Sequence, residues 1–340
     1  MHVSELSTPA LIVDLGALDH NIDVMAATRP GERVRPHVKA FKSTAMAAHV
    51  ADRGGHRSFC CATLREMEGM VDAGLDDDLL LANETLDAPR LGRLAARASR
   101  PLTVAVDSSE TIDAAAAAQA LAGQPIRVLV DVNVGMPRCG CAPGEAGALA
   151  SAARDGGLDV RGVMGYEGHI VGHRDRGWRT EHLAASMVGL RDAHEAVGGG
   201  LVSAGGTGTY DLHDWADEVQ AGSYLLMDWY YGELDLPFRQ ALAVHATVIS
   251  ANTEGAAVAD AGLKAFGMDH GDPRIVGHSM FFCSDEHSTF FVDPGRPVRV
   301  GDGVTMVPGH VDPTVACHER MWVVRGDEVV DEWPVDLRNW

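Results

Sequence analysis

Lysine is nearly absent from this chain. Three lysines occur in 340 residues, at positions 39, 42 and 264. Lysine and arginine together number 28 against 48 aspartates and glutamates, so the formal net charge is -20. A surface this short of positive charge argues against nucleic acid and anionic membrane surfaces as partners. It does not exclude a small anionic ligand, because backbone N–H groups and one or two arginines can hold a phosphate.

Long apolar runs, a secretory leader and zinc-type cysteine spacing are also missing. No stretch reaches the length of a membrane span, and residues 1–9 have no basic region followed by an apolar segment. We therefore expect a cytoplasmic protein. The six cysteines lack zinc-knuckle spacing and are expected to be reduced in that compartment. They stand at positions 60, 61, 139, 141, 283 and 317.

Strand-like and helical stretches alternate from residue 33 to residue 227. The strand-like runs are 33–39, 58–62, 78–82, 102–106, 126–134, 160–166, 201–204 and 219–227. All but the last are followed by a helical stretch or turn, and such alternation predicts a parallel sheet with right-handed crossovers. Eight such units within roughly 200 residues are typical of a (β/α)8 TIM-type barrel. An open doubly wound sheet is the alternative.

The pattern changes after residue 237. Helical periodicity stops, and short apolar runs follow at 243–250, 255–259, 289–292, 304–307, 320–324 and 328–333. Arg325-Gly326-Asp327 has the composition of a hairpin turn between the last two runs. We predict a barrel over residues 15–237 and a β domain over residues 238–340. Residues 1–14, which contain a strand-like run at 11–14, are expected to join the β domain.

Lys39 ends the first strand-like run of the predicted barrel. Active sites of such barrels lie at the carboxyl ends of the strands. A lysine buried there would have a lowered pKa, and a neutral amine can form a Schiff base with a carbonyl group. The alternative is a lysine that simply reaches solvent. Lys42, which lies beyond the expected strand end, is expected to be structural.

Polar residues and glycines gather where the later strands are expected to end. The fifth to eighth strand-like runs lead into Asn133, Met136, Arg138 and Cys139; Tyr166, Glu167, Gly168, His169 and His173; residues 203–210; and Gly222, Ser223, Tyr224 and Asp228. Residues 205–209 (Gly-Gly-Thr-Gly-Thr) suit a phosphate, because glycines admit the backbone closely and threonine hydroxyls donate. A flexible turn is the alternative. A phosphate site together with a lysine suggests pyridoxal 5'-phosphate (PLP).

These residues resemble the fold-type III PLP enzymes, whose barrel is of the alanine racemase N-terminal type. Within that group the chain is most similar to the D-threonine aldolase and D-serine dehydratase-like family. The matching segments span nearly the whole chain and lie at residues 8–14, 35–39, 205–209, 220–224, 260–265, 285–287, 301–302 and 307–314. Two positions depart from the family pattern, since Phe41 stands where histidine is common and Ser288 where glycine is common.

The resemblance implies a cofactor site on the barrel. Lys39 would carry PLP, Gly206, Thr207, Gly208 and Tyr224 would hold its phosphate, and Arg138 would approach its ring near the phenolic oxygen. The full cofactor-binding set is Lys39, Arg138, Tyr166, Gly206, Thr207, Gly208, Thr209, Gly222, Ser223 and Tyr224. The resemblance also implies a homodimer in which each β domain completes the partner's site.

Family members also carry a divalent metal in the β domain, at a His-x-Cys or His-x-Asp pair that here is His310 and Asp312. In an extended segment residues i and i+2 face the same way, so both side chains can reach one ion. A carboxylate favours Mn²⁺ or Mg²⁺, whereas a thiolate favours Zn²⁺. In this family the dehydratase-type sites resemble His-x-Cys and the aldolase-type sites resemble His-x-Asp, so the resemblance implies an aldolase here; Cys317 is a less favoured ligand. A histidine and an aspartate at a plain strand-end turn are the alternative.

The family places an acid–base histidine after the sixth strand, which here is His169 or His173, with His169 favoured. The implied reaction cleaves a D-β-hydroxy-α-amino acid, such as D-threonine, to glycine and an aldehyde. A dehydratase acting on D-serine or D-3-hydroxyaspartate is the first alternative. An amino-acid racemase and a non-catalytic PLP-binding protein are further alternatives.

Overall fold

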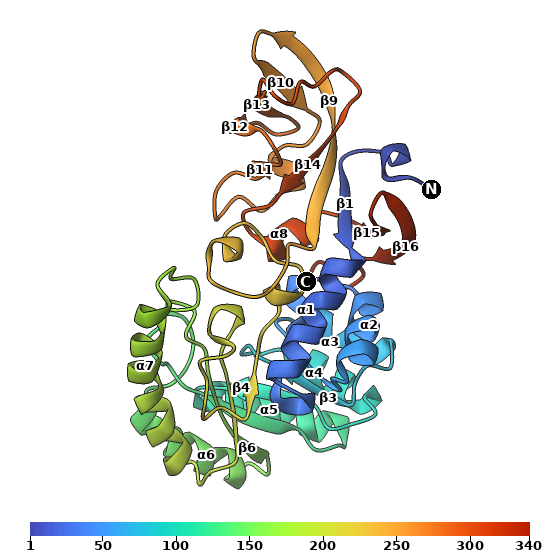
Figure 1. Cartoon of the computed structure of the whole chain (residues 1–340). Coiled ribbons are helices and arrows are strands. Elements are labelled where there is room, and N and C mark those ends of the chain that lie inside the picture. The colour runs from blue at the N-terminus through green and yellow to red at the C-terminus, as the bar shows by residue number, and fades with distance from the viewer. The chain divides into compact units, whose positions relative to one another are not determined.

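The computed structural model in Figure 1 describes residues 1–340, apart from the side chain of Asn252. The chain forms two compact units. The barrel unit comprises Met25–Lys39, Ala47–Gly222 and Asn339–Trp340, and the β unit comprises Met1–Val24, Ala40–Met46 and Ser223–Arg338. From the sequence, the boundaries between the barrel and the β domain were predicted after residues 14 and 237. Residues 40–46 belong to the β unit because Leu337 N–H donates to the carbonyl of Lys42 and Thr44 binds Asp336.

Seven strands of the barrel unit form one parallel sheet in which neighbours in the sequence are neighbours in space. They are β2 Ser58–Cys61, β3 Asp78–Leu81, β4 Thr103–Val106, β5 Arg127–Asp131, β6 Asp159–Gly165, β7 Leu201–Ala204 and β8 Glu218–Val219. Both faces of β2 and β4 are buried, as expected for a parallel sheet covered on both sides. A doubly wound sheet would reverse its strand order at a switch point, so the sequential order excludes that alternative.

The two edges of this sheet are joined through the segment that precedes Lys39. Val34 forms a single parallel bridge with Val219, and His37 forms one with Cys60. Between them, Pro36 has no N–H to donate, although its carbonyl accepts from the N–H of Cys60 at 2.9 Å. The predicted strand 33–39 is therefore wrong: isolated bridges close the barrel, and a 3-10 turn, η3 Val38–Ala40, follows them.

The eighth predicted strand, residues 219–227, is also wrong over most of its length. Strand β8 ends at Val219, and the chain enters another 3-10 turn, η6 Ser223–Leu225. The N–H groups of Leu226 and Met227 turn back to the carbonyl of Ser223. These residues therefore satisfy their backbone groups locally, so the apolar run could be buried without being a strand.

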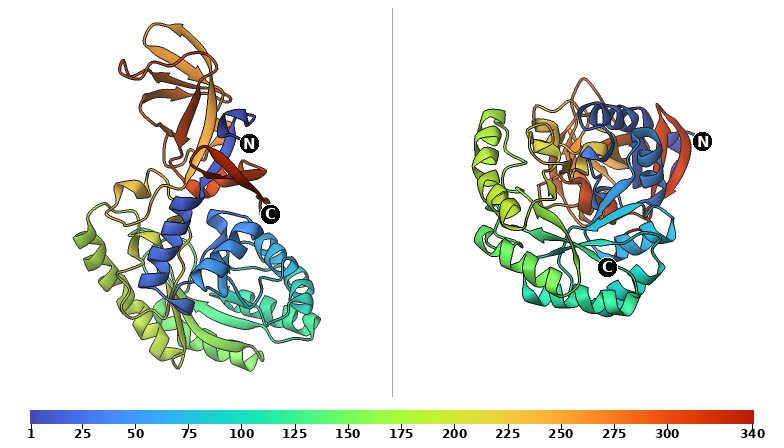
Figure 2. Two further views of the ribbon diagram at one scale, coloured as in Figure 1. Left: turned by 45° about the vertical axis from the view of Figure 1, so that its right-hand side comes forward. Right: turned by 90° about the horizontal axis from the view of Figure 1, so that it is seen from below.

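Helices alternate with the strands, as predicted. They are α1 Leu15–Thr28, α2 Thr44–Gly54, α3 Leu64–Asp72, α4 Ala88–Arg97, α5 Ser109–Ala122, α6 Ala146–Asp155 and α7 Arg176–Ala196. Helix α5 is typical: Ser108 caps its first turn, and Gly123, with φ of 64°, ends it in the left-handed region. Viewed end-on in Figure 2 (right), the helices coloured cyan to yellow-green form an arc outside the strands. Within the described residues, no helix is both long and apolar enough to cross a membrane.

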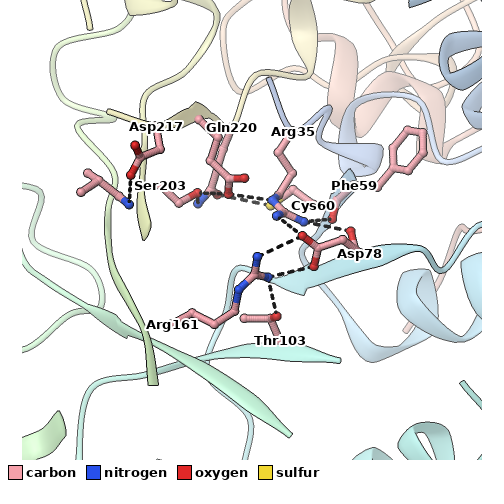
Figure 3. A network of polar contacts seen from close by, with 11 residues as sticks. Arg35, Phe59, Cys60, Asp78, Thr103, Arg161, Ser203, Asp217 and Gln220 are labelled. Carbon is pink, nitrogen blue, oxygen red and sulfur yellow. Dashed lines mark hydrogen bonds and ion pairs between the residues drawn. The ribbon is translucent and has the colours of Figure 1, made fainter. Parts of the chain in front are cut away.

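The amino ends of the barrel strands are tied together by a buried ionic network (Figure 3). The Arg35 guanidinium donates to Glu218 and to Asp78, at 2.7 Å in each case. Arg161 binds the same Asp78 carboxylate at 2.8 and 3.1 Å. Above this network the barrel is filled by apolar side chains, namely Cys60, Leu80, Ala105, Leu129 and Met164. This network stabilises the amino ends of the strands. The carboxyl ends of the strands are where a barrel of this kind carries its active site.

The β unit is built on a nine-stranded, mostly antiparallel sheet. Its elements are β1 Ala10–Asp14, β9 Leu242–Thr253, β10 Ala256–Ala259, β11 Arg274–Ile275, β12 Ser279–Cys283, β13 Ser288–Phe291, β14 Gly303–Val307, α8 Val311–Ala316, β15 Arg320–Arg325 and β16 Glu328–Pro334. The N-terminal strand β1 pairs with β9 and β15, so its predicted place in this sheet is confirmed. Gly326 and Asp327 form the predicted hairpin turn between β15 and β16. The predicted fold, a barrel followed by a C-terminal β domain, is confirmed.

Candidate functional site

Residues 205–209, here called the glycine loop, follow β7 and are anchored by one buried carboxylate. The Oε1 atom of Glu167 accepts from the Thr209 hydroxyl at 2.6 Å and lies 2.8 Å from Nε2 of His213. Its Oε2 atom accepts from the N–H of Gly205 at 3.2 Å. The predicted phosphate cradle is therefore a fixed structure and not a flexible turn. The hydroxyl of Thr209 serves the loop itself in this arrangement.

The glycine loop also packs closely on residues 167–173, here called the histidine loop. A Cβ atom at Gly208 would overlap the backbone carbonyl of Val171, and one at Gly206 would lie 3.3 Å from both the Tyr166 ring and Val171 Cγ1. Glycine is therefore required at Gly208 by close packing, and a side chain at Gly206 would have to displace the Tyr166 ring or Val171. The loop continues as a single 3-10 turn, η5 Thr207–Thr209, whose first N–H groups are suited to an anion.

Lys39 lies in the turn η3, which follows the barrel-closing segment. Its N–H donates to Nδ1 of His37 at 3.4 Å, and the His37 N–H donates to the carbonyl of Ala221 at 3.0 Å. Its side chain is half-buried, and its charge acts on the thiol of Cys60 at the end of β2. Lys39 therefore lies at the carboxyl end of the barrel next to Gly222, although not on a strand.

Arg138 and Tyr166 come from the ends of neighbouring strands, β5 and β6. The guanidinium of Arg138 lies 5.2 Å from the centre of the Tyr166 ring, and that ring is the one that Gly206 approaches. A small cavity opens beside them, lined by Asp131, Val132, Asn133, Val134, Met136, Arg138, Cys139 and Tyr166. The structure thus brings together three of the predicted cofactor residues, Arg138, Tyr166 and Gly206.

An acidic pair beside Arg138 was not found from the sequence. Asp131 ends β5 and is hydrogen-bonded to Glu84; burial, and then the charge of Glu84, raise its pKa well above the ordinary value. Arg138 opposes this rise. Burial and a hydrogen bond to Glu84 also raise the pKa of Cys139 to about 11. The protonated form of Asp131 is therefore favoured beside Glu84, and the thiol of Cys139 stays protonated at neutral pH and is a poor nucleophile.

The two candidate histidines differ in their surroundings. His173 stacks on Trp178 with ring centres 3.9 Å apart, and its Nδ1 accepts from the N–H of Asp175 at 3.2 Å. His169 is exposed, and a Cβ added to Gly135 would lie 3.0 Å from its Nε2. Gly135 belongs to the loop after β5 that also carries Arg138. His169 therefore lies beside the loop after β5 that carries Arg138, whereas His173 is held against helix α7.

Gly222 ends the barrel unit, whereas Ser223 and Tyr224 begin the last segment of the β unit. The side chain of Tyr224 is fully buried, and its ring lies 5.4 Å from that of Phe238. Burial raises the pKa of its phenol. A neutral phenol can donate a hydrogen bond, and the phosphate contact expected of Tyr224 stays a prediction.

His310 and Asp312 flank the start of helix α8 in the β unit. His310 has extended backbone angles, with φ of -141° and ψ of 121°, and Asp312 lies in the first helical turn. The expectation of an extended His-x-Asp segment is therefore wrong. Pro313 fits a first helical turn because its fixed φ suits the helix and its missing N–H is not needed there.

The start of α8 is held from two sides. Asp228, which is fully buried, accepts from the N–H groups of Tyr231 and Val311 at 2.8 and 2.9 Å. Thr314 donates to the carbonyl of His310 at 2.7 Å. Burial raises the pKa of Asp228 to about 6, against the opposing effect of these two N–H groups. The backbone that carries His310 and Asp312 is therefore rigidly placed.

Asp269 and His270 join His310 in a cluster that was not found from the sequence. Nδ1 of His310 lies 2.7 Å from Oδ2 of Asp269, and the ligand atoms of all three residues lie within 4.8 Å of one another. Burial, and then His310, lower the pKa of His270, while Asp269 and Asp312 oppose this. Asp312 is thus close enough for its charge to affect the pKa of His270, although it is not one of the three clustered residues.

The geometry of the His270 and His310 rings decides which of these two histidines can bind an ion. The rings of His270 and His310 are stacked, with centres 4.2 Å apart and planes 8° from parallel. A ring nitrogen binds an ion through a lone pair in the ring plane, at about 2.0–2.2 Å. Lone pairs in two stacked, parallel planes do not converge on one point. The cluster therefore offers one imidazole ligand, His310, together with carboxylates.

Comparison with known proteins agrees with these features. The family model described as "Alanine racemase, N-terminal domain" matches residues 13–229, and "Putative serine dehydratase domain" matches residues 241–324. The 3-hydroxy-D-aspartate aldolase of Paracoccus denitrificans is 33% identical, covering 100% of this chain and 94% of the relative. The D-threonine aldolase of an Arthrobacter species is also 33% identical, covering 99% and 94%. The D-threo-3-hydroxyaspartate dehydratase of a Delftia species is 31% identical, covering 79% and 75%.

A solved structure gives the same result. The D-threonine aldolase from Filomicrobium marinum superimposes with a TM-score of 0.91 at 33% identity, covering 98% of this chain and 96% of that one. The chain belongs to the alanine racemase-like family, in its D-threonine aldolase and D-serine dehydratase branch. The predicted family, its barrel type and the lyase class are confirmed.

The residues present fit PLP, the cofactor that this family supports. Lys39 offers a half-buried amine, the glycine loop offers backbone N–H groups, and Arg138 offers a cation. The glycines also let the loop pack against the histidine loop without a side chain between them. PLP is a phosphorylated pyridine with an aldehyde group. The amine can bind the aldehyde, and the N–H groups and the cation suit the negative charges of the cofactor.

The residues present also fit a hard divalent ion. One imidazole with carboxylates nearby is an oxygen-rich donor set, which suits Mn²⁺ or Mg²⁺ better than Zn²⁺. Cys317 is the nearest cysteine in the sequence, but its thiol donates to the carbonyl of Pro313 in its own helix at 3.3 Å.

Proposed function

We propose that this chain is a PLP- and divalent-metal-dependent aldolase that cleaves D-β-hydroxy-α-amino acids, such as D-threonine, to glycine and an aldehyde. The observation that carries the choice of aldolase is the donor set at the start of α8. His310, whose ring is oriented by Asp269, is accompanied there by the carboxylate of Asp312, and the thiol of Cys317 donates to a carbonyl of its own helix. The named aldolase relatives, which match over nearly the whole chain, support the same choice.

Each barrel residue has a stated role in this proposal. Lys39 would hold the cofactor through its amine, and Thr207 and Gly208 would bind the phosphate through the η5 turn. Arg138, whose guanidinium lies over the Tyr166 ring, would approach the pyridine ring of the cofactor. Bound PLP supplies an electron sink next to the α-carbon of the amino acid. Gly206, Thr209, Gly222, Ser223 and Tyr224 complete the proposed cofactor-binding set.

The remaining chemistry is a proton transfer. His169, or alternatively His173, would take the proton of the substrate β-hydroxyl at a ring nitrogen. His310 and Asp312 would hold Mn²⁺ or Mg²⁺, which lowers the pKa of a hydroxyl that it binds. A base and a cation acting on the same hydroxyl favour cleavage of the bond between the α- and β-carbons.

Product analysis tests the proposal. The purified chain is incubated with PLP and with D-threonine, D-phenylserine, D-3-hydroxyaspartate or D-serine, each with and without Mn²⁺. Glycine plus an aldehyde, formed only with Mn²⁺, is the expected result. Ammonia plus a keto acid would instead establish a dehydratase, the second candidate, which the 31% identical dehydratase relative supports. Inversion without cleavage would indicate a racemase, and PLP binding without any turnover a non-catalytic carrier.

The proposal also includes the cellular setting expected from the sequence. The chain is proposed to act on a small D-amino acid in the cytoplasm, as a homodimer, without nucleic acid or membrane as partners. Light scattering of the purified protein tests the dimer directly: a monomer at assay concentration that is fully active would contradict it.

A further inference from the structure

Glu167 is a buried residue with polar contacts to both ends of the glycine loop, and the proposed chemistry leaves it without a role. It follows Tyr166 directly and has no exposed surface. Three donors meet its two oxygens: the hydroxyl of Thr209, the ring of His213 and the N–H of Gly205. The donors stand at the start of the glycine loop, at its end and just beyond it. One side chain therefore fixes the loop over its whole length.

The contacts require a charged carboxylate. Burial alone would raise the pKa of Glu167, but His213, together with the hydrogen bonds from His213 and Thr209, lowers it below the ordinary value. Ionised, both oxygens accept, and three donors can be satisfied. The backbone of His213 is itself fixed, because Arg29 donates to its carbonyl and to that of Tyr210. The carboxylate thus faces a partner that is held in place.

The same residue begins the histidine loop. The carbonyl of Glu167 accepts from the N–H of Ile170 at 2.8 Å, and the carbonyl of Ile170 accepts from the N–H of His173 at 3.1 Å. Further along, the backbone of Val171 packs on Gly208 with no room for a side chain, and the side chain of Val171 packs closely on Gly206. The two loops are therefore joined twice, once through the carboxylate and once through backbone packing. Displacement of one loop would displace the other.

We propose that Glu167 is a positioning residue that holds the glycine loop in the shape that receives the PLP phosphate and locks the histidine loop to it. This inference rests on the PLP site of the proposed function. It predicts that loss of the carboxylate weakens binding of the phosphate group selectively and loosens both loops together.

The test compares two cofactor forms in matched variants. Glu167→Gln keeps the shape but leaves one acceptor oxygen and introduces an N–H₂ group that faces donors. Dissociation constants are measured by absorbance for PLP and for pyridoxal, which lacks the phosphate. The control is Glu218→Gln, an equally buried glutamate that pairs with Arg35 at the opposite end of the barrel. Thr209→Val, which removes one contact and keeps the volume, serves as a milder second variant.

We expect Glu167→Gln to raise the dissociation constant of PLP about tenfold to a hundredfold and to leave that of pyridoxal nearly unchanged. Thr209→Val should shift PLP in the same direction by less, and Glu218→Gln should lower thermal stability without changing the ratio of the two constants. Hydrogen exchange should accelerate in both loops in Glu167→Gln. Equal weakening of PLP and pyridoxal, or faster exchange in one loop alone, would overturn the inference.

The outcome is separable from the fate of the aldolase proposal. Selective loss of phosphate affinity in a protein that cleaves no D-amino acid would sustain the inference and reject the aldolase. Aldehyde formation with unchanged PLP affinity in Glu167→Gln would do the reverse.

Discussion

Nδ1 of His310 lies 2.7 Å from Oδ2 of Asp269, a residue 41 positions earlier in the chain. A carboxylate held at one imidazole nitrogen fixes the ring orientation and directs the other nitrogen elsewhere, which is the usual arrangement behind a metal-bound histidine. The stacked ring of His270 supports that orientation from one face. The pair therefore prepares Nε2 of His310 to bind an ion, with the carboxylate of Asp312 in the same surroundings.

Asp269→Asn should weaken Mn²⁺ binding about tenfold to a hundredfold, because the orienting charge behind His310 is lost. Free Mn²⁺ measured by electron paramagnetic resonance gives the affinity without any need for turnover. Glu319→Gln, which removes an exposed carboxylate paired with Arg338 in the same unit, is the matched control. An unchanged affinity in Asp269→Asn would show that the contact does not serve metal binding.

Asp312→Ala should abolish the response to Mn²⁺ while PLP remains bound. Removing a ligand carboxylate lowers the affinity for a hard ion, whereas Lys39, Arg138 and the glycine loop stand on the barrel unit. Activity is followed through aldehyde release before and after treatment with EDTA and re-addition of Mn²⁺. Wild-type activity that survives EDTA would contradict the proposed metal role.

Lys39→Ala should eliminate the visible absorbance of bound PLP, because Lys39 is the only one of the three lysines that belongs to the barrel unit. Lys264→Ala is the control, because this side chain is exposed and pairs with Glu286. The control should retain the absorbance and the activity. Retention of the band in Lys39→Ala would mean that another amine holds the cofactor.

The order of the barrel strands could be predicted from the sequence, but the two segments beside Lys39 could not. Apolar runs that alternate with helices specify a parallel sheet through local patterns alone. Residues 33–39 alternate charged or polar residues with Val34, Pro36 and Val38 as a strand would, yet they form only single bridges, because Pro36 lacks an N–H and the chain then turns at η3. Residues 219–227 are mostly apolar, and their burial comes from packing after a strand of two residues.

The site was predictable where its residues lie in short motifs and not where they meet from a distance. The glycine loop and His310 were found because their neighbours form recognisable patterns. Glu167, which holds that loop, and Asp269, which holds His310, were missed as site residues because an acidic residue 38 or 41 positions away carries no local signal. Asp312 was found for a partly mistaken reason, since the segment that carries it is helical.

Acid stability should depend on Asp78 in the network at the base of the barrel. Burial alone would raise the pKa of Asp78, but Arg35 and Arg161 lower it below the ordinary value of 3.8. The carboxylate is therefore charged in the fold at pH values where the unfolded chain is protonated. Its contribution is complete above the unfolded pKa and is lost as the pH falls through the folded value.

Asp78→Asn should consequently unfold at lower temperature at neutral pH and lose less stability on acidification than the wild type. Breaking a buried ion pair costs about 3–5 kcal/mol, and Arg35 retains Glu218 as a partner, so the lower figure is expected. Thermal unfolding followed by circular dichroism between about pH 7 and pH 3 measures both effects. Parallel curves for the two proteins would show that Asp78 does not contribute to the pH dependence.

His169 and His173 should separate cleanly when each is replaced by alanine. The ring of His173 is stacked on Trp178 and bonded to Asp175, so its removal mainly disturbs the start of α7. His169 faces the loop after β5 and is exposed, so its removal leaves the packing intact. As the base, His169 should account for about a hundredfold to ten-thousandfold of kcat, with PLP and Mn²⁺ still bound. The reverse result, a large loss of kcat in His173→Ala with unchanged thermal stability, would assign the proton transfer to His173, because a purely structural defect would lower stability as well.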